Sequence, residues 1–224
     1  VTVLGIGLMG YPMARRLAQA GFEVHAWNRT LAKAQRLTSH GVHVHALAPD
    51  AVRQANIVLT MLDDGAAVEQ VLFDGEVAAA MARDSMVVDM SSIRPIEARD
   101  HAARLSELHI DYLDAPVSGG TIGAEAGTLA IMVGGKASVF DRALPFLQAL
   151  GHPKHVGPTG AGQLAKLANQ MIVGATIGVV AEALLLCERG GANMAKVREA
   201  ITGGFADSRI LQVHGQRMVD RDFV

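Results

Sequence analysis

The first 150 residues alternate between short apolar runs and longer stretches with helical spacing. Apolar runs at residues 1–4, 23–28, 56–62 and 86–91 predict strands, with a short third strand at 42–46 and a further strand at 110–117. Between them, apolar positions three and four residues apart predict helices, of which residues 11–22, 30–41 and 94–109 are the longest. Strands that alternate with helices in this way form a mostly parallel, doubly wound sheet, so the expected fold class is α/β.

The pattern changes towards the C-terminal end of the chain. A glycine-flanked strand is predicted at 127–135, a helix at 136–151 and a final strand and turn at 153–160. From Ala161 onward the sequence is almost entirely helical in period. We therefore expect two domains, residues 1–159 with the sheet and residues 160–224 with helices only, the second of them truncated at its C-terminal end.

One apolar run, Met171–Cys187, is long enough to raise the question of a membrane. It holds 17 residues, which is the short limit for spanning a bilayer, and it contains Glu182, whose charge would be costly near the bilayer centre. We predict a buried helix of a soluble protein and no membrane association. So much apolar area would be a liability on a monomer, so a homodimer or homotetramer is expected.

Composition narrows the choice of function. The net charge of −2 and the absence of a basic stretch argue against a nucleic-acid partner. The single cysteine, Cys187, excludes an internal disulfide and favours a reducing compartment, which we take to be the cytoplasm. No basic segment precedes the first apolar run, so no signal peptide is expected, although we expect residues to be missing at both ends. No metal site is predicted.

A glycine loop follows the first predicted strand. In "GIGLMG", Gly5, Gly7 and Gly10 have the G-x-G-x-x-G spacing, with Leu8 and Met9 between them, and a helix follows directly. Gly5 permits the tight turn, Gly7 lets the backbone approach a pyrophosphate, and Gly10 lets the helix pack closely on the strand. The helix N-terminus offers its N–H groups to the phosphates. This context predicts a dinucleotide site, and the alternative is a glycine-rich turn without a ligand.

The end of the second strand indicates which dinucleotide is bound. An NAD site usually has a carboxylate there, about twenty residues after the loop, to hold the ribose 2′-hydroxyl. This chain has Asn28, Arg29 and Thr30 instead. A guanidinium pairs with a 2′-phosphate, whereas a carboxylate would repel it. We therefore predict NADP(H), with NAD possible, and the alternative for Arg29 is a solvated surface cation.

Three further strand ends carry candidate ligand-binding residues, because ligands of open α/β sheets bind outside the carboxyl ends of the strands. Met61, Leu62 and Asp63 follow one strand and Ser91 another, and we assign them to the cofactor, against the alternative of ordinary loop residues. Ser118, Gly119 and Gly120 follow the strand at 110–117. Their hydroxyl and backbone N–H groups suit a carboxylate, and the alternative is a plain turn.

A polar stripe marks the start of the last helical region. Gln163, Lys166, Asn169 and Gln170 share one helix face between leucines and alanines. A poorly solvated lysine can give a proton to a carbonyl oxygen while a hydride arrives at carbon, and take it back in the reverse direction. On spacing alone, Lys166 is equally well explained as a lysine whose stem lies along the helix and whose ammonium reaches solvent.

Taken together, "GIGLMGYPMARRL", "NRT", "DAPVSGGTIGAEAGTLAIMVGG" and "GAGQLAKLANQ" closely resemble the β-hydroxyacid dehydrogenases, the family of 3-hydroxyisobutyrate dehydrogenase and tartronate semialdehyde (2-hydroxy-3-oxopropionate) reductase. The likeness extends from Val1 to at least Asn193 in order and at fitting distances. The stretch "GTLAIMVGG" is most similar to the tartronate semialdehyde reductase branch.

The resemblance implies a Rossmann domain followed by an all-helical domain whose long first helix is buried between domains and subunits. It implies that Lys166 is the catalytic acid/base, that Ser118, Gly119 and Gly120 hold the substrate carboxylate, and that Asn169 orients the substrate. We add Gln170, from the same polar stripe, as a substrate-binding candidate. It also implies a further lysine in a Lys-Asp pair beyond Val224. The expected activity is hydride transfer between NADP(H) and a short 3-hydroxy acid/semialdehyde pair. The alternatives are a glyoxylate, succinic semialdehyde or imine reductase and, more remotely, a non-catalytic dinucleotide-binding scaffold.

Overall fold

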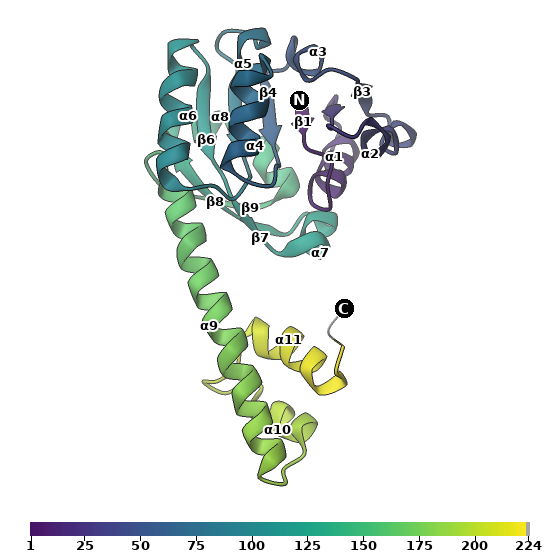
Figure 1. Ribbon diagram of the computed structural model, residues 1–224, viewed down its shortest axis with the longest axis vertical. Coiled ribbons are helices and arrows are strands. Elements are labelled where there is room, and N and C mark those ends of the chain that lie inside the picture. Colours follow the sequence, from purple (N-terminus) through teal and green to yellow (C-terminus); the bar gives the residue numbers. More distant parts are fainter. Residues whose placement is uncertain (223–224) are drawn as a thin grey trace. The chain divides into compact units, whose positions relative to one another are not determined.

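The computed structural model describes residues 1–222, so the last two residues of the predicted second domain lie outside the described part. The chain falls into two compact units, Val1–Lys166 and Leu167–Val224. Figure 1 shows the sheet and its helices in the first unit and helices alone in the second.

Within residues 1–222, the sheet of the first unit has nine strands (Figure 1). Its order is β3-β2-β1-β4-β5-β6-β8-β7, and β9 pairs with β8. The pairs from β3 to β6 are parallel, while β8 runs antiparallel to β6 and β7. The prediction of a mostly parallel Rossmann-type sheet is therefore confirmed. The strands are β1 (Thr2–Leu4), β2 (His25–Trp27), β3 (His43–His45), β4 (Ile57–Thr60), β5 (Met86–Asp89), β6 (Asp111–Asp114), β7 (Val117–Ser118), β8 (Leu129–Gly135) and β9 (Gly151–Gly157).

Helices cover both faces of the sheet, because successive strand side chains point to opposite faces. Val3 and Leu59 pack with α1, α2, α7 and α8 on one face. Leu4 and Val58 pack with α3, α4, α5 and α6 on the other. The helices are α1 (Gly10–Gln19), α2 (Leu31–Gln35), α3 (Ala48–Val52), α4 (Gly65–Glu69), α5 (Val77–Ala80), α6 (Pro95–Glu107), α7 (Gly120–Ala126) and α8 (Ala137–Leu150).

Some elements differ from the predictions. The helix expected at 30–41 consists of α2 and a 3₁₀ turn, η1 (Thr38–His40), and α4 continues into a π-helical segment, η2 (Gln70–Asp74). The single strand expected at 110–117 is two strands, β6 and β7, which Ala115 and Pro116 separate. Proline has no N–H to donate to a sheet ladder, which accounts for this break. The short helices α5 and α7 were not predicted.

The second unit is built on the long helix α9 (Ala161–Arg189), which begins in the first unit, with α10 (Met194–Ile201) and α11 (Arg209–Asp220). Its core is small, with Val180, Leu184 and Leu211 buried. By length and composition α9 is the one helix among the described residues that could cross a membrane, and few residues of its apolar stretch are buried. We predicted this helix to be buried, but in the single chain most of its apolar stretch is uncovered.

Candidate functional site

The glycine loop between β1 and α1 has the geometry that a close ligand approach needs. Gly5 has φ +101°, a conformation that favours glycine. A methyl group on Gly10 would overlap the carbonyl oxygen of Gly5, so this position admits only glycine without a shift of the backbone. A methyl group on Gly7 would have no neighbour within 4 Å. The loop is therefore tightly packed on the protein side and open above Gly7.

Asn28 ties this loop to the end of β2. The Ile6 backbone N–H donates to Asn28 Oδ1 at 2.9 Å, and Asn28 Nδ2 donates to the Thr30 carbonyl oxygen at 3.0 Å. The asparagine amide is thus engaged with the backbone on both sides. It holds the glycine loop beside the Arg29–Thr30 turn, so that both can face one ligand.

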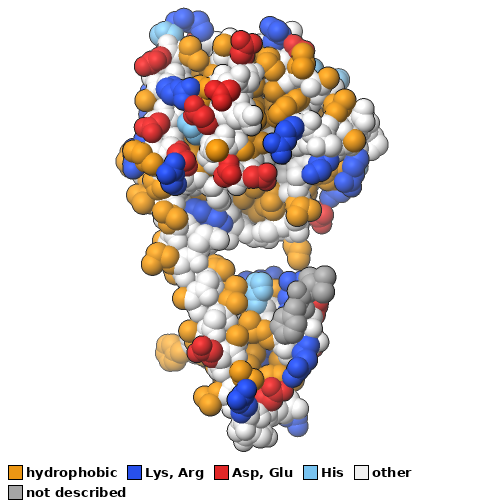
Figure 2. Space-filling model, in the orientation of Figure 1, with side chains coloured by type: hydrophobic (Ala, Val, Ile, Leu, Met, Phe, Trp, Pro, Cys, Tyr) orange, Lys and Arg blue, Asp and Glu red, His pale blue; other side chains and the backbone are white. Residues whose placement is uncertain are grey.

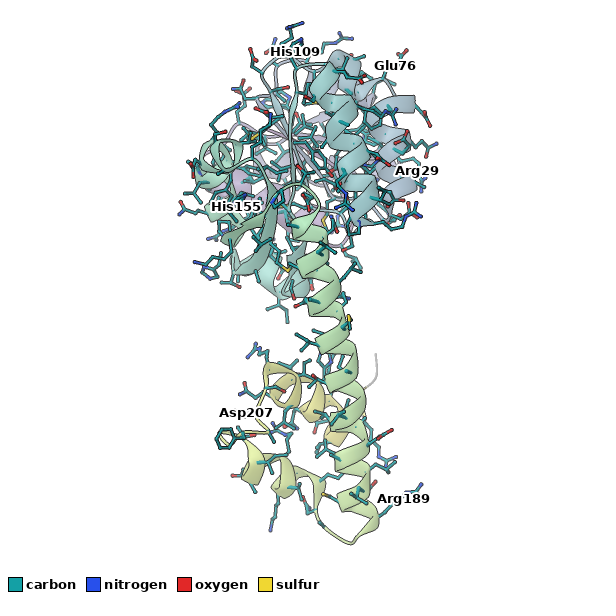
Figure 3. The ribbon with its side chains drawn as sticks, turned by 90° about the vertical axis from the view of Figure 1, so that its left-hand side faces the viewer. Arg29, Glu76, His109, His155, Arg189 and Asp207 are labelled. Atoms are coloured by element: carbon teal, nitrogen blue, oxygen red, sulfur yellow. The ribbon has the colours of Figure 1, made fainter. Side chains whose placement is uncertain are left out.

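A cavity of about 450 Å³ lies where these elements meet. Of the residues assigned to the cofactor, it is lined by Gly5, Gly7, Asn28, Arg29, Thr30, Met61, Leu62 and Asp63. Leu8, Met9, Gly10 and Ser91 are not in its wall: Leu8 projects into solvent, and Gly10 and Ser91 are buried. Arg29 lies at the surface of the first unit (Figure 3). Open glycine backbone, apolar side chains and an exposed cation in one cavity fit a dinucleotide.

The sequence reasoning missed several residues of this cavity. Lys33 follows Arg29 by one helical turn and adds a second exposed cation to the wall. The four-residue spacing of two basic residues is the signal that could have found it. Gln70 and Val71 enter the wall from the π-helical segment η2, and sequence periodicity gives no sign of a π-helix.

Ser91 has a different position from the one that its place after β5 suggests. Its side chain is fully buried, and Oγ accepts a hydrogen bond from the Leu62 N–H at 3.0 Å. Gln163 of α9 donates from Nε2 to the Ser91 carbonyl oxygen at 2.9 Å and accepts from the Ile93 N–H at Oε1 at 3.2 Å. These bonds fix the loops after β4 and β5 relative to the start of α9.

Two buried carboxylates stand next to each other at the ends of β5 and β6. Asp89 accepts hydrogen bonds from Thr60 Oγ1 at 2.8 Å, from the Ser91 N–H at 3.0 Å and from the Tyr112 hydroxyl at 3.1 Å. Burial raises the pKa of both Asp89 and Asp114 above the ordinary aspartate value. Burial, together with the charges of these two carboxylates, raises the pKa of Tyr112.

The Ser118-Gly119-Gly120 turn leads from β7 into α7. Gly119 and Gly120 have φ +135° and +62°, so a side chain at either position would be strained. Both glycines are exposed, Ser118 is half-buried, and a methyl group on Gly120 would meet nothing within 4 Å. The turn therefore presents its backbone and one hydroxyl to open space.

Lys166 points back at this turn. Its Nζ donates to the Val117 carbonyl oxygen at 2.8 Å, and Val117 directly precedes Ser118. The side chain is half-buried, and burial lowers the pKa of the ammonium group below the ordinary lysine value. The sequence left open whether this lysine reaches bulk solvent. In the structure its ammonium is hydrogen-bonded to the backbone one residue before the predicted carboxylate cradle.

The remaining residues of the polar stripe behave differently from one another. Gln163 is buried and serves as the tie described above. Asn169 and Gln170 belong to the second unit, and within residues 1–222 the Asn169 side chain is hydrogen-bonded to Gln170 Oε1, at 3.0 Å. The described contacts thus join Lys166 to the Ser118 segment, while those of Asn169 and Gln170 stay on their own helix.

Two family models match the chain and together cover its whole length. The NAD-binding domain of 6-phosphogluconate dehydrogenase matches residues 1–173. The model described as NAD-binding of NADP-dependent 3-hydroxyisobutyrate dehydrogenase matches residues 160–224.

The similar proteins include a reductase and a dehydrogenase. The 2-hydroxy-3-oxopropionate reductase of Escherichia coli K12 is 46% identical over 98% of this chain and 76% of its own length. The 3-hydroxyisobutyrate dehydrogenase of Mycobacterium tuberculosis, solved with L-serine, has a TM-score of 0.87 at 38% identity, over 95% of this chain and 72% of that one. Psf3, solved with NADP⁺ and 2-OPP, has a TM-score of 0.90 at 25% identity, over 98% of this chain and 78% of that one.

Proposed function

Because the chain belongs to the β-hydroxyacid dehydrogenase family, we propose that it interconverts a short 3-hydroxy acid and its semialdehyde with NADP(H). The preferred pair is tartronate semialdehyde and its hydroxy acid, since the E. coli relative is a 2-hydroxy-3-oxopropionate reductase. The second choice is 3-hydroxyisobutyrate, which the name of the M. tuberculosis relative indicates.

The cofactor part of this proposal rests on the cavity beside the glycine loop. Gly5 and Gly7 would face the pyrophosphate, and Arg29, Thr30 and Lys33 would hold the 2′-phosphate. Leu8, Met9 and Gly10 would contribute backbone at the start of α1, and Met61, Leu62 and Asp63 would line the path from the phosphates. Ser91 would not contact the cofactor; it would hold Leu62 in place by accepting a hydrogen bond from the Leu62 N–H.

The substrate would bind at the Ser118 turn. The Ser118 hydroxyl and the backbone of Gly119 and Gly120 would hold its carboxylate. Asn169 is proposed as a substrate-binding residue from the family resemblance alone, and Gln170 from its place in the polar stripe. The bound dinucleotide supplies the hydride. Lys166 gives a proton to the carbonyl oxygen in the direction of reduction and takes it from the hydroxyl in the direction of oxidation.

The observation that carries this proposal is the hydrogen bond from Lys166 Nζ to the Val117 carbonyl oxygen. It supports the proposal because the ammonium, whose pKa burial lowers, is hydrogen-bonded one residue before Ser118, where a bound carboxylate would bring a carbonyl group within reach.

We further propose that the protein is a homo-oligomer in the cytoplasm. Met171, Ile172, Val179 and Leu186 of α9 are exposed by 65–75% in the single chain, and Figure 2 shows hydrophobic side chains along this helix. A second copy would cover such an apolar surface. The one cysteine, Cys187, is free, which suits a reducing compartment.

The test is NADPH and NADH oxidation by the full-length protein with tartronate semialdehyde, methylmalonate semialdehyde, succinic semialdehyde and glyoxylate. We expect tartronate semialdehyde with NADPH to give the highest kcat/KM. Lys166→Ala should lower kcat by about 10²–10⁴-fold, the contribution of a positioned acid, while NADPH affinity is kept. Lys154→Ala, at an exposed lysine of β9, is the matched control and should keep wild-type turnover. Turnover of Lys166→Ala within a factor of about two of wild type would refute the role.

A further inference from the structure

Asp114 connects the strand that leads to the Ser118 turn with the helix that carries Lys166. Its side chain is fully buried at the end of β6. Oδ1 accepts from the Gly160 N–H at 2.8 Å, and Oδ2 accepts from the Gln163 N–H at 2.9 Å. The first N–H groups of a helix have no partner within it, and a carboxylate there also favours the helix dipole. Asp114 therefore caps α9 from a different element of the fold.

The backbone of β8 and of the first turn of α9 packs closely around Asp114. A methyl group on Gly134 of β8 would lie 2.5 Å from Asp114 Oδ1. A methyl group on Gly162 in the first turn of α9 would lie 2.5 Å from the Asp114 carbonyl oxygen and would overlap the Met132 carbonyl oxygen. Strands β6 and β8 and the helix thus meet backbone to backbone, and two glycines make that approach possible.

The same two segments meet again three residues further along each of them. Gln163 N–H donates to Asp114, and Lys166 Nζ donates to the Val117 carbonyl oxygen. The first turns of α9 are therefore attached at two points to the chain segment that ends in Ser118. The second attachment ends on a long flexible side chain, so its position depends on the first.

Asp89 provides the comparison within the same sheet. It pairs in register with Asp114 on the neighbouring strand and is equally buried. Its partners, Thr60, Ser91 and Tyr112, all lie in the sheet or directly after it, and within the described residues it has no hydrogen bond to α9. Of the two carboxylates, only Asp114 is hydrogen-bonded directly to the backbone at the start of α9, whereas Asp89 is linked to it only through Ser91.

We propose that Asp114 is a positioning residue for Lys166: by capping α9 from the end of β6, it holds the ammonium beside the Ser118 turn and out of bulk solvent. This inference rests on the proposed function, in which Lys166 carries the proton. It assigns Asp114 no contact with substrate or cofactor.

The test is the pH profile of semialdehyde reduction by Asp114→Asn in the full-length protein. Asparagine keeps the shape but has one acceptor oxygen, so either the Gly160 N–H just before α9 or the Gln163 N–H within it loses its partner. Lys166 must be protonated to donate, so kcat falls as pH rises through its pKa. This fall in kcat is the alkaline limb of the pH profile. Released to solvent, the ammonium would regain a more ordinary lysine pKa, so the alkaline limb should move to higher pH. We expect kcat to fall by about 10–100-fold, as for a misplaced catalytic group.

Two controls separate positioning from a general loss of structure. NADPH affinity, followed by the fluorescence of Trp27 in the cofactor cavity, should stay within about twofold of wild type in Asp114→Asn. Asp89→Asn makes the same change at the comparison carboxylate and should leave the alkaline limb in its wild-type place. If Asp114→Asn does not fold, Gly134→Ala gives a second test, because its methyl group would lie 2.5 Å from Asp114 Oδ1 and 2.7 Å from the Gly162 backbone nitrogen, and so would push Asp114 and α9 apart without removing the carboxylate.

The outcomes for the two proposals can be told apart. If Lys166→Ala abolishes the limb and Asp114→Asn lowers kcat without moving it, Asp114 is only structural, and this inference is wrong while the proposed function stands. The inference is also wrong if Asp89→Asn moves the limb as far as Asp114→Asn does. If Lys166→Ala keeps activity and limb, the proposed function is overturned, and the positioning role with it.

Discussion

The cations at the end of β2 give a quantitative prediction about cofactor choice. Arg29 and Lys33 both line the cofactor cavity, and both are exposed. Neither has a hydrogen bond or ion pair to a carboxylate within residues 1–222. We expect Arg29→Ala and Lys33→Ala each to weaken NADPH binding and to leave NADH binding unchanged, because only NADPH carries the 2′-phosphate.

The size of the effect follows from exposure. A hydrogen bond to a charged group contributes about 1.5–3 kcal/mol, and solvent screening at an exposed site favours the lower value. About 1.5 kcal/mol for Arg29 corresponds to roughly a tenfold rise in the Kd of NADPH. Lys33 is a compact, strongly hydrated charge, so its contribution should match an exposed ion pair, about 0.5 kcal/mol or roughly two- to threefold. Arg29→Glu adds repulsion of about 1 kcal/mol, a further fivefold or so, and should make NADH the preferred cofactor.

The assay is equilibrium titration with NADPH and with NADH, followed by Trp27 fluorescence, at two salt concentrations. Trp27 lines the same cavity, so it reports binding without turnover. Arg83→Ala, at an exposed arginine outside the cavity, is the control and should bind both cofactors as wild type does. Raising the salt concentration should reduce the difference in NADPH affinity between wild type and Arg29→Ala, because salt screens an exposed contact between the arginine and the 2′-phosphate.

Equal losses of NADPH and NADH affinity in Arg29→Ala would refute the reasoning, since the arginine would then act on the cavity as a whole. Wild-type NADPH affinity in both Arg29→Ala and Lys33→Ala would place the 2′-phosphate elsewhere.

Two predictions concern stability. Gly10→Ala should lower the free energy of unfolding by about 1–3 kcal/mol, because its methyl group overlaps the Gly5 carbonyl oxygen. Gly7→Ala has room for its methyl group, so it should keep the stability of the fold but weaken NADPH binding. Urea unfolding and NADPH titration check these two variants, and equal stability of both would contradict the prediction. Burial raises the pKa of Asp89, so the folded chain binds the proton of this carboxyl more tightly than the unfolded chain does. The resulting stabilisation is complete below the pKa of the unfolded state and is lost as pH rises through the pKa of the folded state. Wild type should therefore lose stability relative to Asp89→Asn as pH rises, and a free energy of unfolding from urea that changes with pH in the opposite direction would contradict this reasoning.

The sequence predicted those parts of the site whose chemistry is local. The glycine spacing of Gly5, Gly7 and Gly10 marks a turn that few other residues can form, and Lys166 stands out as a charge on an apolar helix. Asp114 and Gln163 could not be assigned in this way. Their partners lie 46–72 residues away, and a buried carboxylate at a strand end looks the same in sequence whether it caps a distant helix or not.

Asn28 and Ser91 also have roles that their position in the sequence does not determine. Their position after a strand predicts contact with the cofactor for both. Asn28 lines the cavity, but its amide is bonded to the backbone of Ile6 and Thr30, and Ser91 is buried beneath Leu62. A polar residue at the mouth of a sheet can touch the ligand or fix the loop that touches it. Only the hydrogen-bond partners decide between these roles, and they come from elsewhere in the chain.

The apolar run of α9 is a different case, because here the pattern predicts burial but not the surface that provides it. A helix that packs on one side has a polar face, whereas this run is apolar almost all round, which is typical of a helix covered on several sides. In the second unit α10 and α11 cover only the part of it around Val180 and Leu184. Met171, Ile172 and Val179 lie on surface that no described residue covers. In the oligomer proposed above, a second copy of the chain, with an identical run of its own, would supply the surface that the pattern predicts.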